Sequence, residues 1–225
     1  MPKIIAIDGP AGAGKSTVAR QVAQRLGWHF LDSGALYRAL SLAALEHGLQ
    51  PTDGHHVAAL GAQLDLRQGP DGRTYLGARD VSSAIRTEAV TAFASRASAQ
   101  PEVRAALLGL QRAAARDADL VCEGRDMGSV VFPDAALKIF LDAQPQVRAG
   151  RRTLELAGQG GSVDAKAVQQ DMEQRDHADS SRAVAPLQCA ADQQPLDTTG
   201  MTVDEVVNRI LELFAERLRE GVARR

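Results

Sequence analysis

A glycine-rich stretch near the start of the chain carries residue types that bind phosphate. It fits the pattern G-x-x-x-x-G-K-[ST] at every fixed position and comprises Gly9, Pro10, Ala11, Gly12, Ala13, Gly14, Lys15 and Ser16, followed by Thr17. Glycines at this spacing let successive backbone N–H groups point at phosphate oxygens. The lysine can reach the β- and γ-phosphates, and the serine hydroxyl can ligate Mg²⁺. The pattern therefore predicts a site for ATP and Mg²⁺.

Polar and basic side chains recur at three later places that could hold a second phosphate. They are Ser33, Tyr37 and Arg38, then Glu123, Arg125 and Asp126, and then Arg175, Asp179 and Arg182. The last three are spaced by four and three, so on a helix they would share one face, as two cations with a carboxylate between them. Transfer between two phosphates needs positive charge around both and exclusion of water, rather than a strong base. A solvated charge is the plainer interpretation of any single arginine, but the glycine-flanked pair Arg125–Asp126 favours a site.

Alternating apolar and amphipathic segments indicate the elements that position these residues. We expect strands at residues 3–7, 28–31, 64–67, 74–77, 119–122, 137–141 and 196–198. We expect helices at residues 15–26, 37–45, 88–116 with an interruption at Pro101, 146–156, 164–179, and from 203 onward. Such alternation predicts an α/β fold with a mainly parallel sheet and helices on both faces. In these folds, ligands bind at the carboxyl ends of the strands, which is where the candidate residues fall.

Two segments depart from this alternation. The turn Gly69-Pro70-Asp71-Gly72 lies between two short strand candidates and predicts a β-hairpin, which we interpret as an insertion at about residues 60–86. The run from Gly158 to Gly161 resembles a flexible joint and predicts a short lid at about residues 151–182. Residues 1–59, 87–150 and 183–225 then form the core of a single domain.

Composition narrows the possible partners and locations. The chain has 225 residues, a net charge of −2 and two distant cysteines. A dedicated nucleic-acid binder normally carries a basic excess, and a membrane span needs about 18 apolar residues, so neither partner is expected. Asp8 interrupts the first apolar run, which argues against a signal peptide, and we expect a cytoplasmic protein. No long apolar stripe remains once the core is assigned, so a monomer is expected.

Three motifs, together with the phosphate loop, carry a specific resemblance. They are D-S-G-x-x-Y-R at residues 32–38, G-R-D-M-G at residues 124–128 and R-A-V-A-P-L at residues 182–187. In this order and at this spacing they resemble the bacterial cytidylate kinases, from residue 3 to about residue 217. The resemblance implies a P-loop NTPase-type fold, with the hairpin as a monophosphate-binding insertion. It also implies transfer of the γ-phosphate of ATP to CMP or dCMP.

The resemblance further implies a role for each candidate residue. The acceptor phosphate would be held by Arg38, Arg125 and Arg182, which with Lys15 form the expected catalytic set, and Ser33 and Tyr37 would line the same pocket. The cytosine ring would be read by Ser95, Arg104 and Asp126, the sugar hydroxyls by Asp179, and Arg175 would belong to the lid side. Ser16 would ligate Mg²⁺. Where the family often has aspartate this chain has Glu123, which could hold a metal-bound water.

The base-reading role agrees with chemistry, because cytosine presents an exocyclic amine for which a carboxylate such as Asp126 is a natural acceptor. Uracil presents a carbonyl at the same place. Two alternatives stay open from the residues alone. One is a kinase for another nucleoside monophosphate or a small hydroxyl compound, and the other is a nucleotide-binding module without turnover. A GTPase switch is disfavoured because the chain has no guanine-reading N-K-x-D segment.

Overall fold

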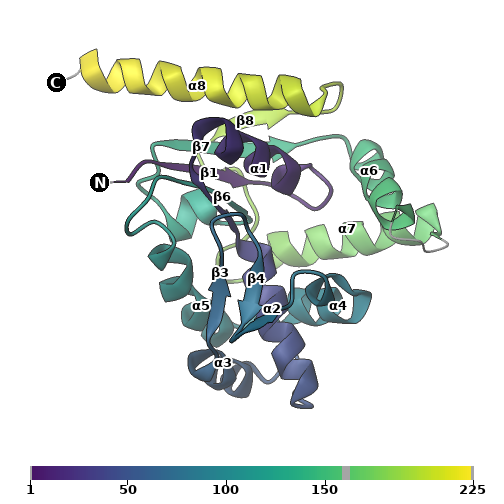
Figure 1. The fold of residues 1–225 in the computed structure, drawn as a ribbon. Helices are drawn as coiled ribbons and strands as arrows, with labels where there is room; N and C mark the ends of the chain where they lie inside the picture. The colour runs from purple at the N-terminus through teal and green to yellow at the C-terminus, as the bar shows by residue number, and fades with distance from the viewer. Residues whose placement is uncertain (1, 159–162, 224–225) are drawn as a thin grey trace.

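The computed structural model describes residues 2–158 and 163–223 and centres on a five-stranded parallel sheet (Figure 1). The strand order is β2-β6-β1-β7-β8, and every paired neighbour runs parallel. The strands are β1 (Ile4–Asp8), β2 (His29–Asp32), β6 (Leu120–Gly124), β7 (Leu137–Asp142) and β8 (Gln194–Asp197). The predicted parallel α/β fold is therefore confirmed.

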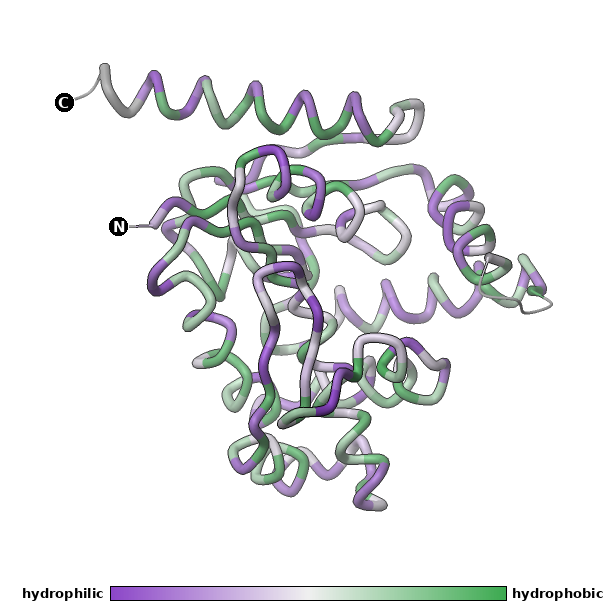
Figure 2. The backbone as a smooth tube through the Cα atoms, in the orientation of Figure 1, coloured by the Kyte–Doolittle hydropathy of each residue, from purple (hydrophilic) through white to green (hydrophobic). Residues whose placement is uncertain are grey.

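Helices cover both faces of this sheet. On one face lie α1 (Lys15–Leu26) and α8 (Val203–Ala223), which pack on β6 and β7 respectively and on each other. On the other face α2 (Ser33–Glu46) lies against β6, and α3 (Gly54–Gln63), α4 (Glu88–Ala97) and α5 (Pro101–Ala113) pack around it. Hydrophobic segments concentrate in the central strands, and the outer helices alternate in polarity (Figure 2). Along β1, Ile5 and Ile7 enter the core beneath α1 and α8, while Ala6 enters the core beneath α2.

The inserted segment forms a second, antiparallel sheet of β3 (Leu66–Gln68), β4 (Thr74–Leu76) and β5 (Arg79–Asp80), followed by the 3₁₀ turn η1 (Ala84–Arg86). The predicted hairpin is confirmed in β3 and β4. Strand β5, which was not predicted, pairs with β4 as a third strand. β5 has two exposed charged residues, so it shows no alternation of apolar and polar residues.

Helix α3 was not predicted. Its sequence, GHHVAALGAQ, holds two glycines and two histidines, which are poor helix formers. The side chain of Asp53 accepts a hydrogen bond from the backbone N–H of His56 and caps the first turn. Burial of Val57 against α5 and its neighbours then stabilises a helix that local propensity alone does not favour.

Helices α6 (Pro145–Ala157) and α7 (Ala165–Ser181) pack against each other to one side of the sheet (Figure 1). Gly158 is the C-cap of α6. The other three residues of the predicted flexible joint lie outside the described residues, so the joint stays a prediction. Within residues 2–158 and 163–223, no helix is both long and apolar enough to cross a membrane.

Candidate active site

The phosphate-binding loop connects β1 to α1 at the carboxyl edge of the sheet, as predicted. Gly14 is the N-cap of α1 with φ 88°, a conformation that favours glycine. A Cβ atom on Gly9 would collide with the carbonyl oxygen of Leu141 in β7, and one on Gly12 would lie 2.7 Å from Cε of Met172 in α7. The loop is therefore enclosed by backbone and by α7, and glycine is required at positions where the fold comes close.

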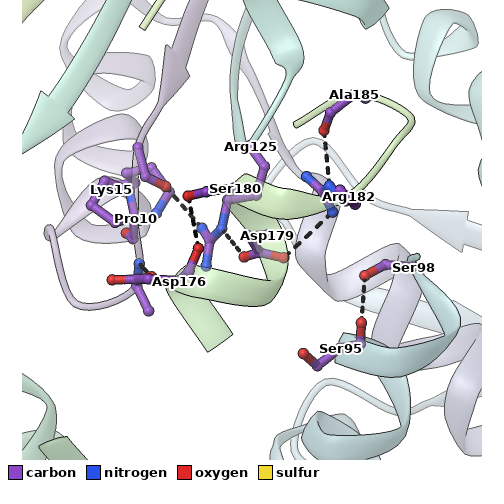
Figure 3. Close-up of polar contacts among 12 residues, drawn as sticks. Pro10, Lys15, Ser95, Ser98, Arg125, Asp176, Asp179, Ser180, Arg182 and Ala185 are labelled. Atoms are coloured by element: carbon purple, nitrogen blue, oxygen red, sulfur yellow. Dashed lines mark hydrogen bonds and ion pairs between the residues drawn. The ribbon is translucent and has the colours of Figure 1, made fainter. Parts of the chain in front are cut away.

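Lys15 lies folded back inside the loop. Its side chain is buried, and Nζ donates a hydrogen bond to the carbonyl oxygen of Pro10 at 2.7 Å (Figure 3). Burial, followed by the positive charge of Arg125, lowers the pKa of Lys15 to about 7. An anionic phosphate in the loop would restore a full positive charge on this side chain.

Ser16 and Glu123 form the candidate metal site. The Ser16 hydroxyl donates to Oε1 of Glu123 at 2.7 Å, across from the first turn of α1 to the end of β6. Burial and the nearby Asp32 carboxylate raise the pKa of Glu123, whereas the Lys15 ammonium lowers it. Among the described residues no cluster of three or more metal-binding side chains occurs. A hydroxyl and one carboxylate fit Mg²⁺, which usually takes one or two protein groups together with phosphate oxygens and waters.

A cavity of about 210 Å³ opens beside the loop and collects the predicted residues from distant parts of the chain. Its lining includes Lys15, Ser16, Ser33, Tyr37, Arg38, Ser95, Arg104, Glu123, Arg125, Asp126, Arg175, Asp179 and Arg182. Every residue predicted to bind the acceptor therefore lies in one cavity. Of the loop residues, Ala11 and Gly12 also line it.

Three buried guanidinium nitrogens, each on an arginine that lines this cavity, have no hydrogen-bond acceptor among the described residues. They are Nε of Arg38, Nε of Arg175 and Nη2 of Arg182. A buried N–H group without a partner costs free energy, and guanidinium groups match phosphate in geometry and charge. The set is therefore complementary to a phosphate dianion.

Asp179 holds two of the arginines in place (Figure 3). Its Oδ2 accepts from Nε of Arg125 at 2.7 Å, and its Oδ1 accepts from Nη1 of Arg182 at 3.4 Å. Arg125 also donates to the carbonyl oxygen of Gly9 at 3.0 Å. Arg175 acts on Asp179 through its charge, whereas the ion pairs of Asp179 are with Arg182 and with Arg125, a partner that the helix spacing did not predict. The helix periodicity correctly grouped the three residues but could not include a partner from the loop after β6.

Arg175 remains a cation at neutral pH even though it is buried among other cations. Burial, and then the charge of Arg125, lower its pKa to about 10. The opposite effect acts on Asp179: burial raises its pKa, but Arg125, Arg175 and Arg182 together lower it more, so the net shift is downward. Both groups are therefore charged near pH 7.

The predicted base-reading residues lie at the far end of the cavity. Asp126 is buried, and its Oδ2 accepts from Nη2 of Arg104. Arg104 also lies over the ring of Tyr37, with its Cζ 5.8 Å from the ring centroid. Ser95 lines the cavity close to Ser98, which donates to its carbonyl oxygen at 3.0 Å (Figure 3). The carboxylate of Asp126 is fixed by a cation and still faces the cavity.

Sequence reasoning missed two carboxylates that position the site. Asp32 caps α2 through Ala35 N–H at 2.8 Å, and Arg38 Nη2 lies 3.2 Å from its Oδ2. Arg86, also missed, lies 4.0 Å from the same oxygen. Asp8 is buried at the end of β1 and accepts from the backbone N–H groups of Met127 and Gly128 at 2.7 and 2.8 Å. The signal for both was available, because each aspartate ends a strand directly before a motif.

A third missed group is Asp176 in α7, which contacts the phosphate loop from the other side (Figure 3). Its Oδ1 accepts from Ala11 N–H at 3.1 Å. Arg148 of α6 pairs with the same carboxylate and donates to the Ala11 carbonyl oxygen at 2.9 Å. These contacts tie α6 and α7 to the loop.

A parallel sheet with a phosphate-binding loop after its central strand, facing a cluster of arginines, defines a P-loop phosphotransferase. The chain is similar in fold to a gluconokinase from Sinorhizobium meliloti, with 16% identity and a TM-score of 0.53 over 99% of this chain and 96% of that one. This distant likeness supports the fold alone.

The family is given by the sequence matches. The cytidylate kinase family model matches residues 5–216. Cytidylate kinases of Bordetella pertussis and Pseudomonas aeruginosa are each 50% identical, over 94% and 92% of this chain and 94% and 93% of those proteins. That of Pectobacterium carotovorum is 47% identical over 97% of this chain and 98% of its own length. The chain belongs to the cytidylate kinase family and is a nucleoside monophosphate kinase.

Proposed function

We propose that the protein transfers the γ-phosphate of ATP directly to CMP or dCMP, giving ADP and CDP or dCDP. The observation that carries this proposal is that Arg38, Arg125, Arg175 and Arg182 line one cavity together with Lys15 and Ser16. One anion fits the loop and a second fits the arginines, so the cavity suits a donor and an acceptor phosphate together. Family membership supports the same reaction.

The donor phosphates would lie in the loop. Its backbone N–H groups and the positive end of α1 would bind their oxygens. Lys15 would leave its hydrogen bond with Pro10 and pair with the β- and γ-phosphates. Mg²⁺ bound at Ser16, with Glu123 holding a metal-bound water, would neutralise charge on these phosphates.

The acceptor phosphate would lie against Arg38, Arg125 and Arg182, with Arg175 on the side of α7. Because this phosphate is already an anion, it needs no general base and can attack in line once it is held close to the donor. The arginines supply fixed donors where charge spreads in the transition state. The hydrogen bonds of Asp176 and Arg148 with Ala11, which hold α7 and α6 at the loop, support a lid at about residues 151–182 that excludes water.

Base and sugar recognition would follow from the remaining residues. Asp126, oriented by Arg104, would accept from the exocyclic amine of cytosine, and Ser95 and Arg104 would contact the ring's other polar edge. Asp179 would receive the sugar hydroxyls while it holds Arg125 and Arg182. Residues 60–86 would act as the monophosphate-binding insertion. A cytoplasmic, monomeric protein stays the expectation from the sequence.

A coupled ADP-release assay tests the proposal. ATP and Mg²⁺ are supplied with CMP, dCMP, UMP or AMP in separate reactions, and turnover is expected with CMP and dCMP far above that with the others. Strong turnover with a different acceptor would favour a kinase of another substrate and would require a new role for Asp126 and Arg104. Binding of ATP without any turnover would favour a nucleotide-binding module.

A further inference from the structure

The free edge of the main sheet meets the inserted sheet beside the acceptor phosphate site. Strand β2 pairs with β6 on one side only. On its other side, the backbone N–H of Phe30 donates to the carbonyl oxygen of Pro70 at 3.0 Å. Two residues further along, the N–H of Asp32 donates to Oε1 of Gln68 at 2.7 Å. The insertion therefore accepts hydrogen bonds from the two N–H groups that β2, as an edge strand, would otherwise expose.

Gln68 pairs with both backbone polar groups of Asp32. Besides accepting from the N–H, its Nε2 donates to the Asp32 carbonyl oxygen at 3.3 Å and to Oγ1 of Thr74 at 3.2 Å. Thr74, on the neighbouring strand β4, is almost completely buried. Strand β3 thus reaches the end of β2 through a side chain that is itself braced by β4.

Asp32 passes this restraint on to the cavity. Its carboxylate caps α2 and pairs with Arg38, and Arg86 lies at 4.0 Å. Packing leaves little freedom here, because a Cβ atom on Gly34 would lie 2.9 Å from Nη1 of Arg38 and 3.2 Å from Oδ1 of Asp32. A shift of the Asp32 backbone would therefore move the guanidinium group of Arg38.

We propose that Gln68 is a positioning residue for the acceptor phosphate, acting through the backbone of Asp32 on Arg38 and Arg86. This inference rests on the proposed function for its kinetic consequence, but not for the restraint itself. In this proposal the inserted sheet fixes the carboxyl end of β2, where Asp32 pairs with Arg38 and lies near Arg86. Among the described residues, Gln68 does not contact the loop after β1 that would bind the donor phosphates, and Asp32 reaches the donor side only through Glu123. A smaller effect is therefore expected there.

The matched pair Gln68→Leu and Arg67→Gln tests the proposal in steady-state kinetics with CMP and ATP. Gln68→Leu removes both bonds to Asp32, and about tenfold weaker CMP binding is expected as a raised KM, from the usual range for lost hydrogen bonds. The KM for ATP should stay within about twofold. Arg67 lies next to Gln68 on β3 but bonds to the Gly77 carbonyl oxygen inside the insertion, so Arg67→Gln should change neither KM. Equal changes in both KM values, or a lowered Tm with unchanged KM values, would overturn the proposal.

Hydrogen exchange separates this inference from the proposed function. In Gln68→Leu, exchange of the Asp32 amide should accelerate by about tenfold or more, and in Arg67→Gln it should not change. Unchanged exchange in Gln68→Leu would overturn the inference whether or not the protein uses CMP. A wild-type protein that is inert with CMP would instead refute the proposed function alone.

If Gln68→Leu fails to fold, Gln68→Asn replaces it in the test. The shorter asparagine side chain cannot reach both backbone groups of Asp32, so this variant should also accelerate exchange of the Asp32 amide. Wild-type exchange in that variant would count against the restraint.

Discussion

The phosphate loop supplies its half of the site from one continuous stretch, residues 9–17, whereas the acceptor half is assembled from side chains on several separate segments. In the loop the binding groups are mainly backbone N–H groups that the turn itself orients, with Lys15 as the one added charge. In the acceptor half the proposed binding groups are mainly arginines, from α2, η1, α5, the loop after β6 and the region of α7. The first half is local, and the second depends on the whole fold.

This difference determines what holds each half in place. The loop needs glycine where β7, α6 and α7 approach it. The arginines need buried carboxylates instead: Asp32 for Arg38, Asp126 for Arg104, and Asp179 for Arg125 and Arg182. Each of these carboxylates is almost fully buried, so loss of one would leave a charge without its partner.

The largest effect is expected in the donor half. Lys15→Ala should lower kcat by roughly 10²–10³-fold, because it removes a preorganised charge that no backbone group can replace. Circular dichroism and Tm should remain close to wild type, since the buried ammonium already carries a desolvation penalty. Lys3→Ala, which removes an exposed lysine just before the amino end of β1, away from the loop, serves as the control and should keep full activity. Full activity of Lys15→Ala would contradict the loop assignment.

Asp8 joins the two halves, and its effect should appear in the pH dependence of stability. Burial raises its pKa from 3.8 to about 6, although hydrogen bonds from the backbone of Gly128 and Met127 oppose this. Between these two values the folded protein keeps a proton that the unfolded chain has lost, so its stability should fall as the pH rises through this window. The shift corresponds to about 3 kcal/mol in total.

Urea unfolding of wild type and Asp8→Asn between pH 4 and 7 measures this contribution. Asparagine does not titrate, so the wild type should lose stability relative to the variant as the pH rises. In wild type, the N–H groups of Met127 and Gly128 each donate to one oxygen of Asp8. The amide NH₂ of asparagine cannot accept such a bond. The segment after β6 should therefore shift, and the affinity for CMP should fall. Parallel stability curves would show that Asp8 titrates normally.

The sequence predicted the local half of the site almost completely. The loop pattern gave Gly9 to Thr17, the strand before it and the helix after it, because spacing along one segment determines the geometry. The acceptor residues came together only through the family resemblance. Periodicity placed Arg175, Asp179 and Arg182 on one face, but the pairing of Asp179 with Arg125 links segments 54 positions apart.

Three features of the fold were missed for a similar reason. Helix α3 forms because Val57 is buried by tertiary packing, against weak local propensity. Strand β5 exists only as a partner of β4. Asp8 and Asp32 function through the backbone groups they hold, and a sequence alone does not say which N–H groups will be near a carboxylate. Helix and strand propensity and residue spacing describe single segments, so they do not predict contacts between segments that are distant in sequence.

A smaller effect is expected for base recognition in the acceptor half. Asp126→Ala should lower the ratio of kcat/KM for CMP to that for UMP by roughly 10- to 100-fold, the range for a lost hydrogen bond to a charged group. Turnover at saturating CMP should fall less. Asp126→Asn keeps the shape of the side chain but removes its charge beside Arg104. This variant therefore separates loss of the hydrogen-bond acceptor for cytosine from loss of the ion pair with Arg104. Equal losses with CMP and UMP would exclude a base-reading role.

The smallest effect distinguishes the charges of the two halves. Lys15 has a pKa of about 7, so at pH 8 it is mostly neutral, whereas the pKa of Arg175 in the acceptor half is lowered only to about 10 and this side chain keeps its charge. ATP phosphates favour the charged lysine, so ATP binding at pH 8 should take up close to one proton. Calorimetry in buffers of different ionisation enthalpy measures this uptake, and Lys15→Arg, which is always charged, should abolish it. CMP binding at pH 8 should involve almost no uptake, because its arginines are already protonated. Equal proton uptake with ATP and CMP would mean that the titrating group does not belong to the donor half. The two halves would then differ in which segments build them, but not in the protonation of their cations.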